Sequence, residues 1–211
     1  MHIEQQLDKN RVEAITDGIY AIAMTLGVLT INVSDLPTGA AGGDILRHFG
    51  LIFPQVMHYA IAFFVLISFW MAHHRQMSMI CRVDSTYVWL NLVSLFFVAT
   101  VPFTTDLMGT YSSSPAAVSF YAGNLFIIGL FASLAWFYAT AKKRLVAPDF
   151  PNKHILLVRV LCVSVPAVSL VVILYAHLVS ADYATLLFML LPVVQKLIKS
   201  LFTGKSRAGS A

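Results

Sequence analysis

The side chains best suited to chemistry lie in the first apolar segment of the chain, between Arg11 and Leu29. Ile22, Leu26 and Leu29 recur at spacings of three and four residues, which place side chains on one face of a helix. Thr25 shares that face and puts one hydroxyl at mid-depth in a segment long enough to cross a bilayer. Hydroxyl oxygens can replace part of the hydration shell of a cation. Thr25 also suits a well-packed helix in which it bonds to the preceding turn.

A set of polar residues lies near the start of the same segment and at the end of the second apolar segment. A carboxylate such as Asp17 is costly inside a membrane unless it is paired or hydrogen-bonded. We therefore expect a polar network that joins the first span to the second and fixes the tilt of the first, formed by Arg11, Thr16, Asp17, Trp70 and His73. The alternative is a direct ion-contacting or proton-sensing role for Asp17.

The histidines and cysteines do not form a convincing metal or haem site. His73 and His74 are adjacent, so on a helix they point about 100° apart and do not easily chelate one ion. Cys81 and Cys162 are far apart in sequence and give neither a disulfide framework nor metal-ligand spacing. The sequence contains no C-x-x-C-H motif, and no paired carboxylates or Ser–His arrangement is evident. We expect no cofactor, no resident metal and no enzymatic activity.

Six membrane-spanning helices are predicted to position these side chains. The 211 residues are 58% hydrophobic and only 11% charged, whereas soluble domains carry about 25% charged residues. The apolar residues form blocks of the length needed to cross about 30 Å of hydrocarbon. The sequence predicts a single all-α, polytopic membrane domain over residues 1–203 and a disordered tail over 204–211. The spans are expected at about 12–33, 53–72, 87–108, 116–141, 155–178 and 183–202.

The distribution of Lys and Arg predicts the orientation of the chain. Twelve of the 14 Lys and Arg residues lie in the N-terminal segment, the second and fourth connections, and the end of the sixth span with its tail. The three alternate connections contain only Arg47, and Arg159 is expected to snorkel to the basic side. Both termini are therefore predicted to be cytoplasmic. Topology also explains the net charge of +4, so no nucleic-acid partner is expected; the Lys142-Lys143-Arg144 cluster suits anionic lipid head groups equally well.

The first span also carries a pattern beyond its periodicity, namely Arg11, Asp17, Gly18 and the run Ala21-Ile22-Ala-x-Thr25-Leu26-x-Val28-Leu29. This pattern resembles the R-x-x-x-F-S-D-G signature of the endolysosomal potassium channel family, the transmembrane protein 175 family, in its prokaryotic form with six helices per chain. The end of the second span, Trp70-Met-Ala-His73, resembles the W-x-x-H ending of that family. Four positions depart from the family pattern: Ile15, Thr16, Gly27 and Thr30.

The resemblance implies a potassium-permeable channel in the plasma membrane of a prokaryote, with membrane lipid, potassium ions and further copies of the chain as its partners. Four first helices would surround the axis of a homotetramer. Ile22, Leu26 and Leu29 would line the pore as apolar constrictions, and Thr25 would form a selective ring in place of a carbonyl filter. The sequence indeed lacks a T-V-G-Y-G loop. The rival interpretation is a secondary transporter of a small cation or solute, although no internal repeat is visible.

Overall fold

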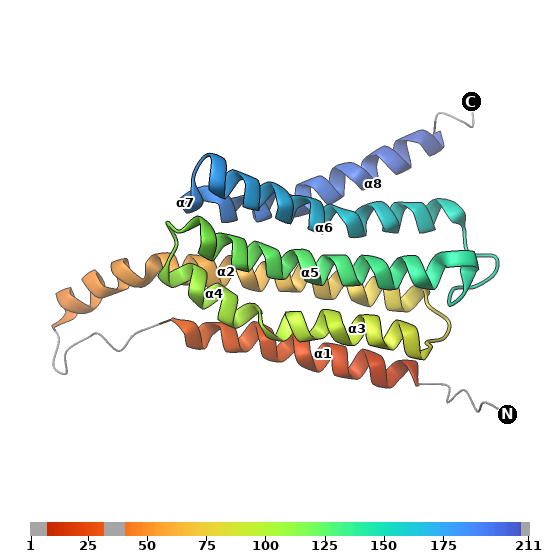
Figure 1. Cartoon of the computed structure of the whole chain (residues 1–211), viewed down its shortest axis with the longest axis horizontal. Helices are drawn as coiled ribbons and strands as arrows, with labels where there is room; N and C mark the ends of the chain where they lie inside the picture. Colours follow the sequence, from red (N-terminus) through yellow and green to blue (C-terminus); the bar gives the residue numbers. More distant parts are fainter. Residues whose placement is uncertain (1–7, 32–40, 208–211) are drawn as a thin grey trace.

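In the computed structural model, the chain forms a bundle of long helices (Figure 1). The structure describes residues 8–31 and 41–207. Within these residues, six helical segments are long and apolar enough to cross a membrane: Lys9–Thr30, Gly42–Met79, Ser85–Thr110, Pro115–Lys143, Asn152–Leu178 and Ala181–Phe202. The predicted all-α fold with six spans in this order is confirmed.

Several spans contain more than one helical element. In chain order the elements are α1 (Lys9–Leu26), η1 (Gly27–Thr30), α2 (Gly42–Met79), α3 (Ser85–Ala99), α4 (Val101–Thr110), α5 (Pro115–Thr140), η2 (Ala141–Lys143), α6 (Asn152–Leu178), α7 (Ala181–Ala184), η3 (Thr185–Leu190) and α8 (Leu191–Arg207). The expected end of the first span, at residue 33, lies outside the described residues. Helix α8 enters the segment 204–211 for which a disordered tail was predicted, and residues 208–211 lie outside the described part.

Helix α2 starts at Gly42, well before the predicted beginning of the second span at residue 53. The carboxylate of Asp44 accepts a hydrogen bond of 3.2 Å from the Ala41 backbone N–H and so caps this earlier start. The 38 residues of α2 correspond to about 57 Å at 1.5 Å per residue, almost twice the ~30 Å of a bilayer core. The first part of α2 consequently projects past the end of η1 (Figure 1).

The third span is broken between α3 and α4. The break falls at Thr100, and Pro102 follows in the first turn of α4, where the missing N–H of proline does no harm. Asn124 of α5 spans the break: its amide N–H₂ donates to the Phe97 carbonyl at 3.2 Å, and its amide oxygen accepts from the Thr100 hydroxyl at 3.1 Å. The break is thus held by side-chain hydrogen bonds from the neighbouring helix.

Helix α5 runs through the middle of the bundle and is packed between α3 and α6. Its Tyr121, Leu125 and Trp136 are fully buried. A Cβ added at Gly129 would lie only 2.8 Å from Cδ of Pro166 in α6, so the glycine permits a close approach of the two helices. Small residues commonly perform this function between membrane helices.

The connections at one end of the bundle are tied together by side chains. Helix α1 begins and α8 ends at this end, which also carries the α2–α3 and α5–α6 connections (Figure 1). The phenol of Tyr138 donates to the Asp84 carboxylate at 2.7 Å and accepts from the Arg144 guanidinium at 2.7 Å. An isolated bridge joins Ile80 to Val146. The two connections therefore form one joined, basic end of the molecule.

Candidate functional site

Helix α1 has two distinct faces within the chain. Its buried residues recur at intervals of four and three positions, which define one stripe that packs on the bundle: Val12, Thr16, Tyr20, Ala23 and Gly27. This stripe faces α2, α3 and α4. The opposite stripe is not covered by any described part of the chain.

The four residues predicted to line a pore all lie on the uncovered stripe. The exposed fractions are 58% for Ile22, 44% for Leu26 and 76% for Leu29, and Thr25 is exposed as well. The structure thus brings these four residues together on one face of α1 and its continuation η1. Such a face must meet lipid, a neighbouring subunit or a water-filled path.

The Thr25 hydroxyl is anchored to its own helix. It lies 3.0 Å from the carbonyl oxygens of both Ala21 and Ile22 and donates its single proton to them. The bond to the preceding turn that the sequence suggested is therefore present. Because the proton is engaged by the backbone, the oxygen keeps its remaining lone-pair capacity for a ligand on the exposed side.

Gly27 marks the point at which α1 tightens into the 3₁₀ turn η1. A Cβ at this position would lie 2.9 Å from Cδ2 of Tyr59 in α2, so only glycine lets the ring lie against α1 without a shift. The Tyr59 hydroxyl also approaches the Met24 carbonyl at 3.4 Å. Tyr59 of α2 therefore packs directly against the buried face of the segment that carries Thr25 and Leu29.

Two hydrogen bonds connect the predicted polar network to α1. The indole N–H of Trp70 donates to the Asp17 carboxylate at 2.8 Å and joins α1 to α2. The side-chain amide of Asn91 donates to the Thr16 hydroxyl at 3.0 Å and joins α1 to α3. Thr16 is fully buried and donates to the Val12 carbonyl at 2.8 Å. These bonds fix the rotation of α1 about its own axis and its position along the neighbouring helices α2 and α3.

His73 and Arg11 take different positions relative to this network. His73 lies close to Asn91 and Asp17, and its Nε2 atom is buried with no hydrogen-bond partner among the described residues. The next residue, His74, stacks on the Trp70 ring with 5.8 Å between ring centroids. Arg11 is exposed, and its side chain has no hydrogen bond or ion pair with the described part of the chain. Within the chain, Arg11 is therefore separate from the other four residues.

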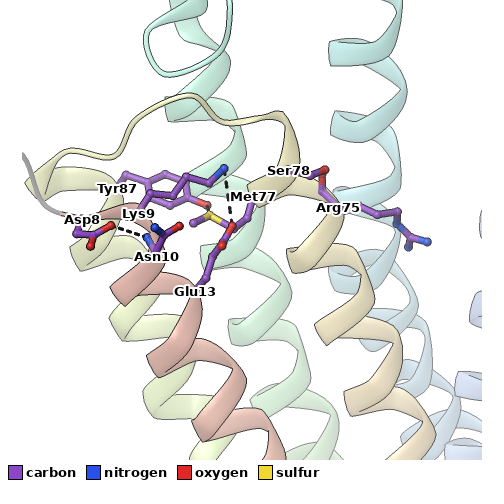
Figure 2. A network of polar contacts seen from close by, with 8 residues as sticks. All are labelled: Asp8, Lys9, Asn10, Glu13, Arg75, Met77, Ser78 and Tyr87. Carbon is purple, nitrogen blue, oxygen red and sulfur yellow. Dashed lines mark hydrogen bonds and ion pairs between the residues drawn. The ribbon is translucent and has the colours of Figure 1, made fainter.

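The first turn of α1 is held by local polar contacts at the basic end (Figure 2). The Asp8 carboxylate accepts from the Asn10 backbone N–H at 2.9 Å and caps the helix. Lys9 and Glu13 form an i,i+4 ion pair of 3.8 Å. Beside them, the buried Tyr87 hydroxyl of α3 donates to the sulfur of Met77 in α2 at 3.2 Å.

Comparison with known proteins identifies the family of the chain. The family model described as "Endosomal/lysosomal potassium channel TMEM175" matches residues 11–102, which carry α1, the polar network and the break before α4. A protein of Streptomyces collinus described as a potassium channel is 32% identical over 145 residues, which cover 67% of this chain and 69% of the relative. The chain belongs to the TMEM175 family.

Further TMEM175 relatives agree in sequence and in fold. A protein of Chamaesiphon minutus described as a potassium channel is 32% identical over 146 residues, or 68% of this chain and 71% of the relative. The crystal structure of a lysosomal potassium-selective channel TMEM175 homolog from the same organism matches with a TM-score of 0.71 and 25% identity, covering 90% of this chain and 96% of that one. The family is one of channels and not of enzymes.

Sequence reasoning missed two contacts of this TMEM175 chain. Asn91 was not among the residues expected in the polar network, yet its side-chain amide donates to Thr16 in α1. Tyr59 had not been singled out, although it lies against Gly27. The available signal for Asn91 was a buried amide within an apolar block. Nothing in the sequence distinguished Tyr59 from the other aromatic residues.

Proposed function

We propose that four copies of this chain assemble around α1 and conduct potassium ions along the uncovered stripe of that helix. In this proposal Ile22, Leu26 and Leu29 form apolar constrictions, and Thr25 forms a ring of hydroxyl oxygens that favours potassium. The proposal rests on one observation above all: Ile22, Thr25, Leu26 and Leu29 lie on the face of α1 that the rest of the described chain leaves open.

The physical properties of these side chains support conduction with a gate. A narrow apolar ring resists wetting, so Ile22 can limit the passage of a hydrated ion. The anchored Thr25 oxygen can replace part of the hydration shell of a cation at the neighbouring level. Potassium is less strongly hydrated than sodium, so a few neutral oxygens favour potassium. Because hydroxyls form a sparser cage than carbonyl rings, we expect modest selectivity.

The relatives and the polar network also support the proposal. Two bacterial relatives are described as potassium channels, and a homologous structure as potassium-selective. A pore helix must keep one rotation, and the bonds from Trp70 to Asp17 and from Asn91 to Thr16 supply that constraint. Arg11 and His73 complete this network in the proposal, with Arg11 available to the neighbouring subunit because its own subunit leaves it exposed.

We also propose that the joined basic end of the bundle faces the cytoplasm at the plasma membrane of a prokaryote. The start of α1 and the end of α8 lie at this end. It also carries Arg75 near the end of α2 and the basic residues Arg82, Lys142, Lys143 and Arg144 of the two connections, and the positive-inside rule assigns such an end to the cytoplasm. A cysteine-accessibility assay on intact cells, with a reporter thiol in each connection, tests this orientation.

The Thr25 hypothesis is tested by replacing Thr25 with valine, which keeps the shape and removes the hydroxyl. With potassium and sodium on opposite sides of a reconstituted bilayer, the shift in reversal potential should show a lower potassium preference. The matched control is Thr30→Val, which removes a hydroxyl that also bonds within its own turn, to the Gly27 carbonyl at 2.8 Å. An unchanged permeability ratio in Thr25→Val removes the selective ring from the proposal.

The Ile22 hypothesis is tested by making the constriction polar. Ile22→Asn should raise the current at equal protein density, because a polar ring is easier to wet. In a background with Cys81 and Cys162 replaced, a cysteine at position 22 should react with a charged thiol reagent, whereas a cysteine at the exposed Leu174 of α6 should not. Position 22 reacting only with lipid-soluble reagents refutes a water-filled path along α1.

A further inference from the structure

A cavity of about 430 Å³ lies at the joined basic end, where α5 turns into α6. Its charged and polar lining consists of Lys142, Lys143, Arg159, Thr140 and Asn152. No carboxylate lines it, so the three cations are not neutralised within the cavity. Asn152 is also the first residue of α6, and no side chain caps the free N–H groups of that helix end. Such a concave site attracts an anion.

The backbone at this cavity is held in an unusual conformation. Lys142 and Lys143 both have positive φ angles, of 51° and 55°, which residues with a Cβ rarely adopt. The Lys143 amine donates to the Pro148 carbonyl, which stabilises the turn. The Lys142 side chain is exposed and has no hydrogen bond or ion pair within the described residues. The turn thus presents at least one uncommitted ammonium group at the cavity.

Arg159 connects the basic cavity to an apolar groove. Its guanidinium donates from Nε and Nη2 to the Thr140 hydroxyl at 3.2 and 2.9 Å, and it lies 5.5 Å from the centre of the Phe137 ring. Five donors are available on a guanidinium, so others remain free. The same side chain lines a groove of about 530 Å³, whose walls include Phe137, Val163, Ala167, Val171, Val194 and Ile198. One residue therefore belongs to both a cationic and an apolar site.

We propose that the two cavities together form the binding site of one anionic phospholipid. The phosphodiester lies between Lys142, Lys143 and Arg159, and an acyl chain follows the groove between α6 and α8. The groove extends along α6 from Arg159 to Val171, which is about 18 Å at 1.5 Å per residue. One leaflet of hydrocarbon is about 15 Å deep. The groove therefore matches a single acyl chain in the leaflet on the basic side.

The position of this site in the bundle leaves it open to lipid. Helices α6 and α8 lie on one side of the molecule and α1 on the other, with α2 and α5 between them (Figure 1). If copies of α1 from several chains surround a central axis, α6 and α8 lie on the outside of the assembly and face the bilayer. The lipid proposal does not depend on ion conduction, because it requires only that the six helices span a membrane.

Native mass spectrometry of the full chain in detergent, after incubation with phosphatidylglycerol or phosphatidylcholine, tests the proposal. The wild-type chain should retain phosphatidylglycerol in preference to phosphatidylcholine. Lys142→Gln should weaken phosphatidylglycerol binding about fivefold, the usual effect of one basic residue at an anionic surface. The matched control is Lys153→Gln, which removes an exposed lysine at the same end that does not line the cavity. An equal effect of both changes overturns the site, because the attraction is then diffuse.

The groove is tested with Ala167→Trp, which fills it, against Leu170→Trp, which places the same indole at an exposed position of α6 outside the groove. Only Ala167→Trp should reduce lipid retention; equal retention in the two variants overturns the acyl-chain assignment.

A competition experiment distinguishes a lipid from a free anion. Glycerol 3-phosphate at the same concentration should not displace phosphatidylglycerol. If glycerol 3-phosphate does displace phosphatidylglycerol, the site binds free anions and the lipid proposal is refuted.

Discussion

The close contact between α5 and α6 makes Gly129 the most sensitive glycine in the middle of the bundle. In Gly129→Ala, the new Cβ lies 2.8 Å from Cδ and 3.2 Å from Cγ of Pro166, and 3.0 Å from Cγ1 of Val165. Carbon atoms at their best separation are about 3.5–4.0 Å apart. The proline ring is rigid, so the helices must separate. Overpacking of this kind costs about 1–3 kcal/mol, and the better helix propensity of alanine offsets at most about 1 kcal/mol.

We therefore expect Gly129→Ala to lower the free energy of unfolding by about 1 kcal/mol, the middle of the range that remains after this offset, which corresponds to a Tm lower by about 2–4 °C for a chain of this size. Thermal unfolding in detergent, followed by the fraction of protein that elutes without aggregation, measures the change. Gly123→Ala is the matched control, since it lies in the same helix and its Cβ would meet nothing within 4 Å. An unchanged or higher Tm for Gly129→Ala refutes the close-packing argument.

Two further substitutions test the bonds that orient the helices. Trp70→Phe removes the donor to Asp17 and should lower the free energy of unfolding by about 1 kcal/mol, as measured by unfolding in mixed micelles. The control Trp89→Phe changes an exposed indole and should have a smaller effect. Equal effects would show that the bond to Asp17 does not stabilise the fold. Asn124→Leu removes the amide that bonds to the Phe97 carbonyl and should also cost about 1 kcal/mol; in hydrogen exchange α4 should lose protection while α5 keeps its own, and uniform protection would contradict this role.

The number, order and approximate position of the spans could be predicted because a helix in lipid needs a long apolar stretch. The early start of α2 could not be predicted in this way. Its first turns contain Gly42, Gly43 and Arg47, which are typical of a connection, and a helix that projects beyond the hydrocarbon is not constrained by hydropathy. The break at Thr100 does have a signal in the sequence, because Pro102 is typical of the first turn of a helix.

Only the part of the candidate site that lies on a single helix could be predicted from the sequence. Helical spacing placed Ile22, Thr25, Leu26 and Leu29 on one face, and the structure has them there. Partners on other helices depend on how each helix is rotated, which the sequence of a single helix does not specify. The expected proximity of Trp70 and Asp17 came from the cost of an unpaired carboxylate inside a membrane, whereas nothing in the sequence pointed to Thr16 as the partner of Asn91. The contacts between the two basic connections were missed for the same reason.

The break in the third span has a mechanical consequence. Two rods that share one non-helical residue can bend about that point, whereas an unbroken helix of the same length resists bending along its whole backbone. Helix α4, on the far side of the break, contacts η1, the segment that carries Leu29. The C-terminal end of the first span therefore packs on α4, which can move relative to α3 at the break. Its earlier part packs on α3, which is continuous.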